Sequence, residues 1–454
     1  MTKKYKEKSR RTTLKKGISF YDEAPKLINI KGYYLLLLPI KQSTTIRVDC
    51  NIFGGNLLES PDDSGIAHIL EHILMDSWRK CGDQQCSLYL EKYGIASNAS
   101  THQMFTSYWA KSLLEFQNII LNYIFDIIFF PKITQKLIDS EKKIVKNELE
   151  GYMNVPSWKL DDLVTKNFYK SNGLRYSEDY KKQTDDLKNI TKETLHKYLN
   201  RTRLEKCIMF TVSGSFNKEI ILTFFNKKFQ NVPPSRYKCK MSHFDPSKSC
   251  FTRRKRVLYV ENKQAQNTEM YICFPTNIFK NNKYSKFLPF VNSIVAGDLT
   301  SLIIKRLRIE LNLVYGASIF HLQNLCGSAL FISIATLDKN VIKVLSETFK
   351  IIKKYSETLI PNNTLLHEKR KYSLYSRQIS KSNPDNVASF YTHQFFWQLN
   401  KQYKQIYTMN ELHNFIKKIS RHTIQKIIKT IFNTDHCIVG YIGKKQLGFT
   451  TDDF

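Results

Sequence analysis

The chain has few glycines and prolines and no long apolar run. Its 16 Gly and 12 Pro among 454 residues exclude a collagen-like or low-complexity protein. No apolar run approaches the roughly 20 residues that a membrane-spanning helix needs, so we expect no membrane span. The start of the chain, residues 1–16, lacks the apolar core of a secretory signal, but its basic character leaves organelle targeting open.

The nine cysteines are scattered along the chain and include no CxxC pair. Their spacing indicates neither a disulfide framework nor a thiolate zinc site. We therefore expect reduced thiols, and a cytoplasmic or other reducing compartment.

The charge is strongly unbalanced, because 70 Lys and Arg against 40 Asp and Glu give a formal net charge of +30. Such an excess attracts nucleic acid, anionic membranes or acidic peptides over long distances. The excess is diffuse, and its densest clusters, residues 3–16 and 253–256, lack aromatic residues spaced for base stacking. We expect a solvated basic surface and no specific nucleic-acid partner, with nucleic-acid or anion binding as the weakest functional alternative.

Helix and strand patterns alternate along the chain and fall into two stretches of similar order. Residues 231–252 are rich in Pro and Ser and poor in apolar residues, as linkers are. We interpret them as a linker between an N-terminal domain of residues 17–230 and a C-terminal domain of residues 253–454, with a basic tail at 1–16. The similar order of elements predicts a duplicated α+β fold.

The segment His68-Ile69-Leu70-Glu71-His72 has the spacing of a metal site. On a helix, His68 and His72 lie one turn apart on one face, where two imidazoles can bind one zinc ion. Glu71 lies near that face and is placed to act as a base rather than as a ligand. The alternative is a partly buried helix whose His and Glu side chains only form hydrogen bonds.

A hydrolytic zinc site also needs a third protein ligand and an open position for water. Glu141 and Glu148 are seven residues apart, which places them two turns apart on one face of the helical stretch 140–150. One of them can bind zinc while the other supports the site from behind. The alternative is a solvated helix, because mixtures of Glu and Lys commonly face water.

With these residues in this order, the chain resembles the pitrilysin/insulinase family of zinc peptidases, the inverzincins. Seventy-five residues separate His72 from Glu148, within the family range, and the family also has a Glu seven residues before the third ligand. The resemblance implies His68, His72 and Glu148 as zinc ligands, Glu71 as the catalytic base and Glu141 as a supporting carboxylate. It covers most of residues 16–454 and points to half-length members, the type of the mitochondrial processing peptidase β subunit and its bacterial homologues.

Two further matches to the family concern the substrate. Asn98, Ala99 and Ser100 resemble the substrate-binding edge strand, and an exposed strand edge can pair with an extended peptide. Arg308 and Tyr315 resemble an Arg/Tyr pair that reaches the active site from a different domain and stabilises the oxyanion. The alternatives are an ordinary edge strand, an Arg308 paired with a local acid and a Tyr315 packed in the core.

The resemblance implies a zinc-dependent endopeptidase that cleaves peptides or unfolded segments, bound as an added β-strand in an enclosed chamber. The implied fold is two related domains, each a mostly antiparallel sheet covered by helices. Half-length relatives work as dimers, so we expect a homodimer or a heterodimer with a paralogue. The main alternative is a non-catalytic scaffold or partner subunit of such a heterodimer, although this chain retains every expected ligand.

Overall fold

A computed structural model describes most of the chain. The described residues are 25–56, 59, 64–169, 179–237, 252, 255–276, 284–324, 327–380, 383–399 and 405–453. The basic tail at 1–16, most of the expected linker at 231–252, and Cys239, Cys250 and Cys326 lie outside them.

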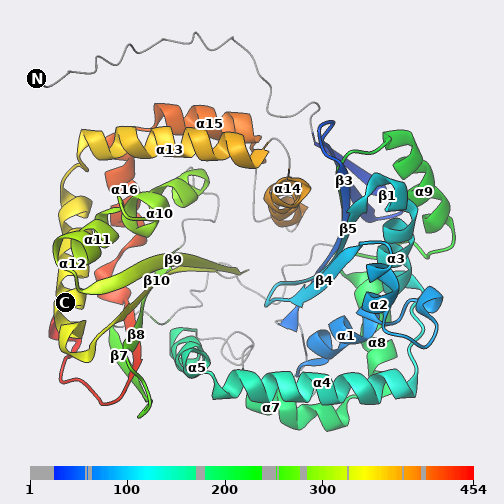
Figure 1. Cartoon of the computed structure of the whole chain (residues 1–454), viewed down its shortest axis with the longest axis horizontal. Helices are drawn as coiled ribbons and strands as arrows, with labels where there is room; N and C mark the ends of the chain where they lie inside the picture. Colours follow the sequence, from blue (N-terminus) through cyan, green and yellow to red (C-terminus); the bar gives the residue numbers. More distant parts are fainter. Residues whose placement is uncertain are drawn as a thin grey trace, which may run out of the picture.

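The first half of the chain forms a six-stranded sheet with the order β1-β2-β6-β3-β5-β4 (Figure 1). Its strands are β1 (Lys26–Ile30), β2 (Tyr33–Pro39), β3 (Thr45–Phe53), β4 (Ala96–Thr101), β5 (Phe105–Leu113) and β6 (Ile208–Gly214). Neighbouring strands are antiparallel except β2 and β6, which are parallel. The central strand β6 is buried along its whole length, whereas β4 ends the sheet order and so lies at an edge.

The second half forms a five-stranded sheet with the order β7-β11-β8-β10-β9. Its strands are β7 (Arg256–Glu261), β8 (Thr268–Thr276), β9 (Val314–Asn324), β10 (Gly327–Thr336) and β11 (Ile438–Gly443). Here β7 and β11 are parallel, and the other neighbours are antiparallel.

The two sheets have one topology. The order β2-β6-β3-β5-β4 in the first sheet corresponds to β7-β11-β8-β10-β9 in the second, with the parallel pair in the same place. Each closing strand also follows a buried cysteine and begins with isoleucine, at Cys207-Ile208 and at Cys437-Ile438. The predicted duplicated α+β fold, with mostly antiparallel sheets covered by helices, is confirmed.

Helices cover both sheets. Those of the first half are α1 (Ile66–Met75), α2 (Cys86–Glu91), α3 (Gln117–Phe129), α4 (Gln135–Asn154), α5 (Pro156–Phe168), α7 (Tyr180–Asp186), α8 (Lys192–Glu205) and α9 (Lys218–Gln230). Those of the second half are α10 (Leu288–Ala296), α11 (Leu302–Ile304), α12 (Val341–Glu357), α13 (Asn362–Ser380), α14 (Pro384–Leu399), α15 (Met409–Lys418) and α16 (Arg421–Ile431). Within the described ranges, no helix is both long enough and apolar enough to cross a bilayer.

Amphipathic spacing explains why these segments form helices against the sheets. The apolar face of α12 recurs every three or four residues, as a helix packed on one side requires. Its buried residues are Val341, Val344, Leu345, Thr348, Phe349 and Ile352. This face joins α10 and α16 in the core of the second half, while α1, α3 and α9 contribute to the core of the first half.

Each half also provides a helix to the sheet of the other half. Helix α5 packs on β11 and β7, and α14 packs on β6, β3 and β2. Side chains of both helices, including Leu160, Val164, Val387 and Tyr391, belong to a third core that both sheets share. The two halves are therefore joined by exchanged helices as well as by the chain between them.

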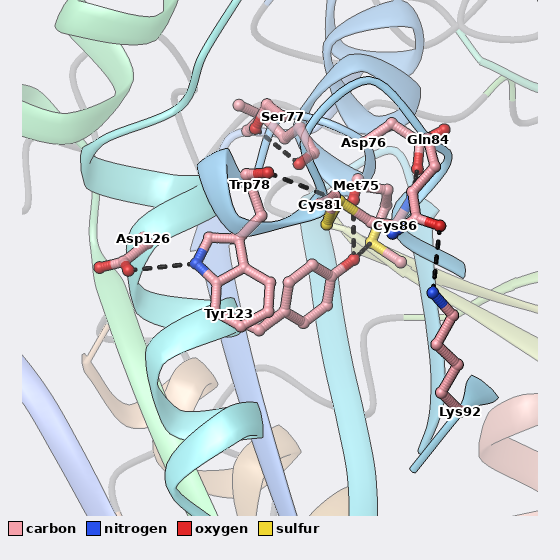
Figure 2. The surroundings of a disulfide bond; sticks show 11 residues. Met75, Asp76, Ser77, Trp78, Cys81, Gln84, Cys86, Lys92, Tyr123 and Asp126 are labelled. Atoms are coloured by element: carbon pink, nitrogen blue, oxygen red, sulfur yellow. Dashed lines mark hydrogen bonds between the residues drawn. A yellow bond between two sulfur atoms is a disulfide. The ribbon is translucent and has the colours of Figure 1, made fainter. Parts of the chain in front are cut away.

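A disulfide joins Cys81 to Cys86, so the expectation of reduced thiols is wrong for this pair (Figure 2). A 3-10 turn at Arg79–Cys81 and the tight loop before α2 bring the two Cα atoms to 5.2 Å, within the range that a disulfide bridges. The pair was missed because five residues of sequence do not reveal a loop that turns back on itself. The buried cysteines Cys50, Cys207, Cys273 and Cys437 are free thiols.

Candidate active site

Helix α1 carries the two histidines of the HxxEH segment. Its N-terminus is capped by the carboxylate of Glu59, which accepts hydrogen bonds from the backbone N–H groups of Gly65 (2.9 Å) and Ala67 (2.8 Å). A negative charge at this end also suits the helix dipole. The apolar face of α1 is buried in the core of the first half through Ile66, Ile69, Leu70, Ile73 and Leu74. This packing sets which face of α1 the histidines occupy.

His68 and His72 meet Glu148 of the neighbouring helix α4. Each of the three side chains offers one ligand atom, and these atoms lie within 4.8 Å of one another. Oε2 of Glu148 is 3.3 Å from Nε2 of His72 and 3.7 Å from Nε2 of His68. Two imidazole nitrogens and one carboxylate oxygen are a donor set that zinc accepts in catalytic sites, with a fourth position left for water. The side chains therefore fit a zinc ion.

Burial and neighbouring charges set the protonation of the three side chains in this cluster. Burial, followed by the charge of His72, lowers the pKa of His68 to about 4, so its imidazole is neutral at pH 7. The hydrogen bond from His72 lowers the pKa of Glu148 to about 2. Burial lowers the pKa of His72, but its hydrogen bonds to carboxylates outweigh burial and raise this pKa to about 10. Metal binding at His72 would therefore release a proton.

Glu141 contacts His72 on the side of its ring that faces away from Glu148. Its Oε2 is 3.3 Å from Nδ1 of His72, while Nε2 of the same ring faces Glu148. Glu141 is buried, so this contact is shielded from water. A carboxylate in this place fixes the orientation and tautomer of a ligating histidine.

Glu71 is buried beside the cluster and hydrogen-bonded to Thr101 of β4. Burial raises its pKa above the ordinary value for a glutamate. Among the described residues, Glu71 is not part of the group of converging ligand atoms. It is a carboxylate that lies beside the converging ligand atoms without being one of them.

Tyr152 is a contact of the cluster that the sequence interpretation missed. Its hydroxyl donates a hydrogen bond to Oε1 of Glu148. Burial, and then the adjacent carboxylate, raise the pKa of Tyr152 to about 12, so the phenol is protonated at neutral pH. The signal that could have found it is its position four residues after Glu148, one turn along α4.

A cavity of about 550 Å³ opens at the cluster and lies between the two halves. His68, Glu71 and Glu148 line one side of it, together with residues 99–105 of the β4–β5 hairpin. The second half contributes His321 of β9 and His393 and Trp397 of α14. Nε1–H of Trp397 donates to Nε2 of His393 over 2.9 Å. The sequence interpretation missed these three residues, because nothing local connects them to the HxxEH segment.

The expected substrate strand is β4, at the edge of the first sheet. Ala99 and Ser100 line the cavity, and Oγ of Ser100 is 3.1 Å from Nε2 of His102. Oδ1 of Asn98 instead accepts a hydrogen bond from the N–H of Ala99 over 2.8 Å. The strand edge and the cluster thus share one cavity.

Arg308 and Tyr315 pack on each other but lie elsewhere. Arg308 is in a π-helical turn, Lys305–Glu310, and Tyr315 is at the start of β9, with 84% of its surface exposed. The alternative of a Tyr315 packed in the core is therefore wrong. Neither residue is among the described residues that line the cavity. His321, which does line it, is six residues from Tyr315 along β9, about 20 Å at the rise of a strand.

Comparison with known proteins identifies the family. A model described as insulinase (peptidase family M16) matches residues 37–180, and a model described as the M16 inactive domain matches residues 189–372. The chain belongs to peptidase family M16. In this M16 chain the first match contains α1 and α4, which carry His68, His72 and Glu148. The second match contains Arg308 and Tyr315.

Curated relatives of the M16 chain align over part of its length. An uncharacterized zinc protease of Bacillus subtilis is 25% identical over 167 residues, which are 37% of this chain and 40% of the relative. The mitochondrial-processing peptidase subunit beta of Caenorhabditis elegans is 23% identical over 186 residues, 41% of this chain and 40% of the relative. Each match therefore spans less than half of the relative.

The fold of the M16 chain is shared with solved structures over nearly its whole length. A protease from Helicobacter pylori superposes with a TM-score of 0.76 at 15% sequence identity. The superposition covers 92% of this chain and 99% of that one. At this identity the likeness establishes the architecture alone.

Proposed function

We propose that this M16 chain is a zinc metallo-endopeptidase, in which His68, His72 and Glu148 hold Zn²⁺. The observation that carries the proposal is the convergence of these three ligand atoms within 4.8 Å, next to the buried Glu71 and at the wall of a cavity. Glu141 supports the site by orienting His72.

The proposed mechanism uses the side chains in fixed roles. Bound Zn²⁺ supplies a Lewis acid that polarises a peptide carbonyl and lowers the pKa of water to about 7. Glu71 accepts a proton from the attacking water and later gives it to the leaving amine. The raised pKa of Glu71 suits both steps, because a base that must also act as an acid works best near the operating pH.

The proposed substrate is an extended peptide or an unfolded segment. The edge position of β4 supports this, because a peptide that adds to a strand edge is held mainly by its own backbone. Asn98, Ala99 and Ser100 would form the added pairing, with Ala99 and Ser100 at the cavity. The limited volume of about 550 Å³ between the halves favours a chain without tertiary structure.

We further propose that the working unit is a dimer, either of two copies or with a paralogue. Within one chain, Tyr315 is about 20 Å along β9 from His321 at the cavity wall, and Arg308 packs on Tyr315. Tyr315 is 84% exposed and Arg308 is partly exposed, so both can contact another chain. A partner that presents this pair to the cavity would stabilise the oxyanion there.

A second candidate function is that of a non-catalytic partner subunit. The observation in its favour is the match of residues 189–372 to a family model described as an inactive domain. Such a subunit would need the fold and the contact surface, and it would not need the metal.

The test pairs metal analysis with cleavage of a mixed peptide library, using wild type and Glu71→Gln. We expect one zinc per chain in both proteins, and chelator-sensitive cleavage that falls by about 10²–10⁴-fold in Glu71→Gln. Bound zinc without cleavage by wild type would favour the partner-subunit function. A chain that takes up no zinc at saturating supply would contradict the proposal.

A further inference from the structure

We propose that Tyr152 is a positioning residue for Glu148, which holds this carboxylate so that only one of its oxygens faces the metal. The inference rests on the zinc site proposed above. It concerns a residue outside the ligand set, and it makes a separate statement about metal affinity.

The two oxygens of Glu148 have different partners. Oε2 is the atom that faces Nε2 of His72, at 3.3 Å, and Nε2 of His68, at 3.7 Å. Oε1 accepts the hydrogen bond from the hydroxyl of Tyr152. A carboxylate whose second oxygen is held by a donor binds a metal through one atom, which leaves coordination positions open for water and for a substrate carbonyl.

The ring of Tyr152 is fixed independently of Glu148. Its centroid is 4.9 Å from that of Trp158 and 5.5 Å from that of Tyr180. The rings of Trp158 and Tyr180 also contact each other, at 5.5 Å. The three residues come from α4, α5 and α7, so three helices together hold the hydroxyl in place, as a preorganised supporting contact requires.

This aromatic cluster connects the third ligand to the second half of the molecule. Trp158 is in α5, the helix whose other residues pack on β11 and β7. Tyr152 therefore links the carboxylate of Glu148 to α5, a helix of the first half that packs on the sheet of the second half. The hydroxyl makes this connection, through its hydrogen bond to Oε1 of Glu148.

The experiment compares metal affinity in wild type, Tyr152→Phe and Tyr33→Phe. Tyr152→Phe keeps the ring and removes the hydroxyl. Tyr33→Phe controls for the loss of any buried phenol, because the hydroxyl of Tyr33 donates to the carbonyl oxygens of Arg203 (3.3 Å) and Pro233 (3.0 Å), in the core of the first half. Zinc affinity is measured by competition with a chromophoric chelator, and the absorption spectrum of the Co²⁺-loaded protein reports the ligand geometry.

We expect Tyr152→Phe to bind zinc about 10–100-fold more weakly and to change the Co²⁺ spectrum, while Tyr33→Phe keeps the wild-type affinity and spectrum. Equal affinity and equal spectra in wild type and Tyr152→Phe would overturn the inference and leave the proposed peptidase untouched. An equal loss in Tyr33→Phe would overturn it too. The expected affinities without any peptide cleavage would overturn the proposed function alone, and a wild type that binds no zinc would overturn both.

Discussion

The guanidinium of Arg308 stacks on the ring of Tyr315, with its central carbon 4.7 Å from the ring centroid. Both residues lie where the regular backbone geometry is interrupted. Arg308 is in the π-helical turn, and Tyr315 lies where the register between β9 and β10 shifts, between Ile334 and Thr336. Bulges and π-helical turns redirect side chains and are common at functional sites. The pair is therefore preformed in each chain, away from the cavity of that chain.

If a second copy supplies this pair, two inactive variants should restore each other. Glu71→Gln lacks the base and Arg308→Ala lacks the guanidinium, and each alone should have little activity. Mixed at equal amounts and allowed to exchange subunits, they should recover about a quarter of wild-type peptidase activity, because half of the dimers would contain one intact site. Mixtures that stay inactive at every ratio would contradict an arrangement in trans.

The contact between α5 and β8 should make stability depend on pH. Burial raises the pKa of Asp161 from an ordinary 3.8 to about 6. The hydrogen bond with Tyr271 lowers this pKa, but burial outweighs it. Between these pH values the folded protein binds more protons than the unfolded chain, so stability falls as the pH rises from about 4 to about 6. This loss, up to about 3 kcal/mol, is complete above pH 6.

Asp161→Asn should therefore raise the free energy of unfolding by about 1–3 kcal/mol at pH 8 and leave it nearly unchanged at pH 4. Urea unfolding at the two pH values measures this. Asp162→Asn is the matched control, because it removes a 2.8 Å ion pair with Lys166 and should cost a few tenths of a kcal/mol, roughly. An equal gain of stability in the control would show that the effect is not specific to Asp161.

The disulfide between Cys81 and Cys86 should stabilise the fold beside α1, the helix that carries His68 and His72. The N–H of Cys86 donates to Oδ1 of Asp76, the C-cap residue directly after α1, over 2.7 Å (Figure 2). For a loop this short, chain entropy gives a stabilisation of about 2 kcal/mol. A dithiol reductant should lower the urea midpoint of wild type. The double variant Cys81→Ser, Cys86→Ser should have the midpoint of reduced wild type, with or without the reductant. A wild type that ignores the reductant would contradict this.

Close packing of α5 on β11 should make Gly440 intolerant of a side chain. A Cβ at Gly440 would lie 2.4 Å from Cγ2 of Val164 and 3.1 Å from Cδ1 of Leu160. We expect Gly440→Ala to destabilise the protein by about 1–3 kcal/mol, and the double variant with Val164→Ala to lose less than the sum of the two single changes. Gly448→Ala, which has open space around the new Cβ, is the control. Additive losses would indicate that α5 and β11 are not in such close contact.

The sequence alone identified those features that depend on local spacing. His68 and His72 are one helical turn apart, and Glu141 and Glu148 are two turns apart, so the period of a helix was enough to group them. That α1 and α4 lie side by side could be inferred only from the family resemblance. The fold class and family are confirmed, while the roles of the site residues stay predictions.

Features that depend on long-range packing were not predictable. The apolar stripe of α5 or α14 indicates that a helix is buried, but it does not say against which sheet. His321 reaches the cavity from β9 and His393 reaches it from α14, both far along the chain from the HxxEH segment. No local pattern distinguishes them from other histidines. The part played by Tyr152 depends on the direction of one hydroxyl, which spacing suggests but does not fix.

The exchange of α5 and α14 also has a consequence for how the chain reaches its native state. One face of the first sheet is covered by α14, which begins at Pro384 and leaves the ribosome long after β6 has been made. Until then, the apolar residues of that face have no permanent cover. A nascent or truncated chain that stops before Pro384 would leave this apolar face exposed to water, and apolar surface exposed during synthesis is prone to aggregation.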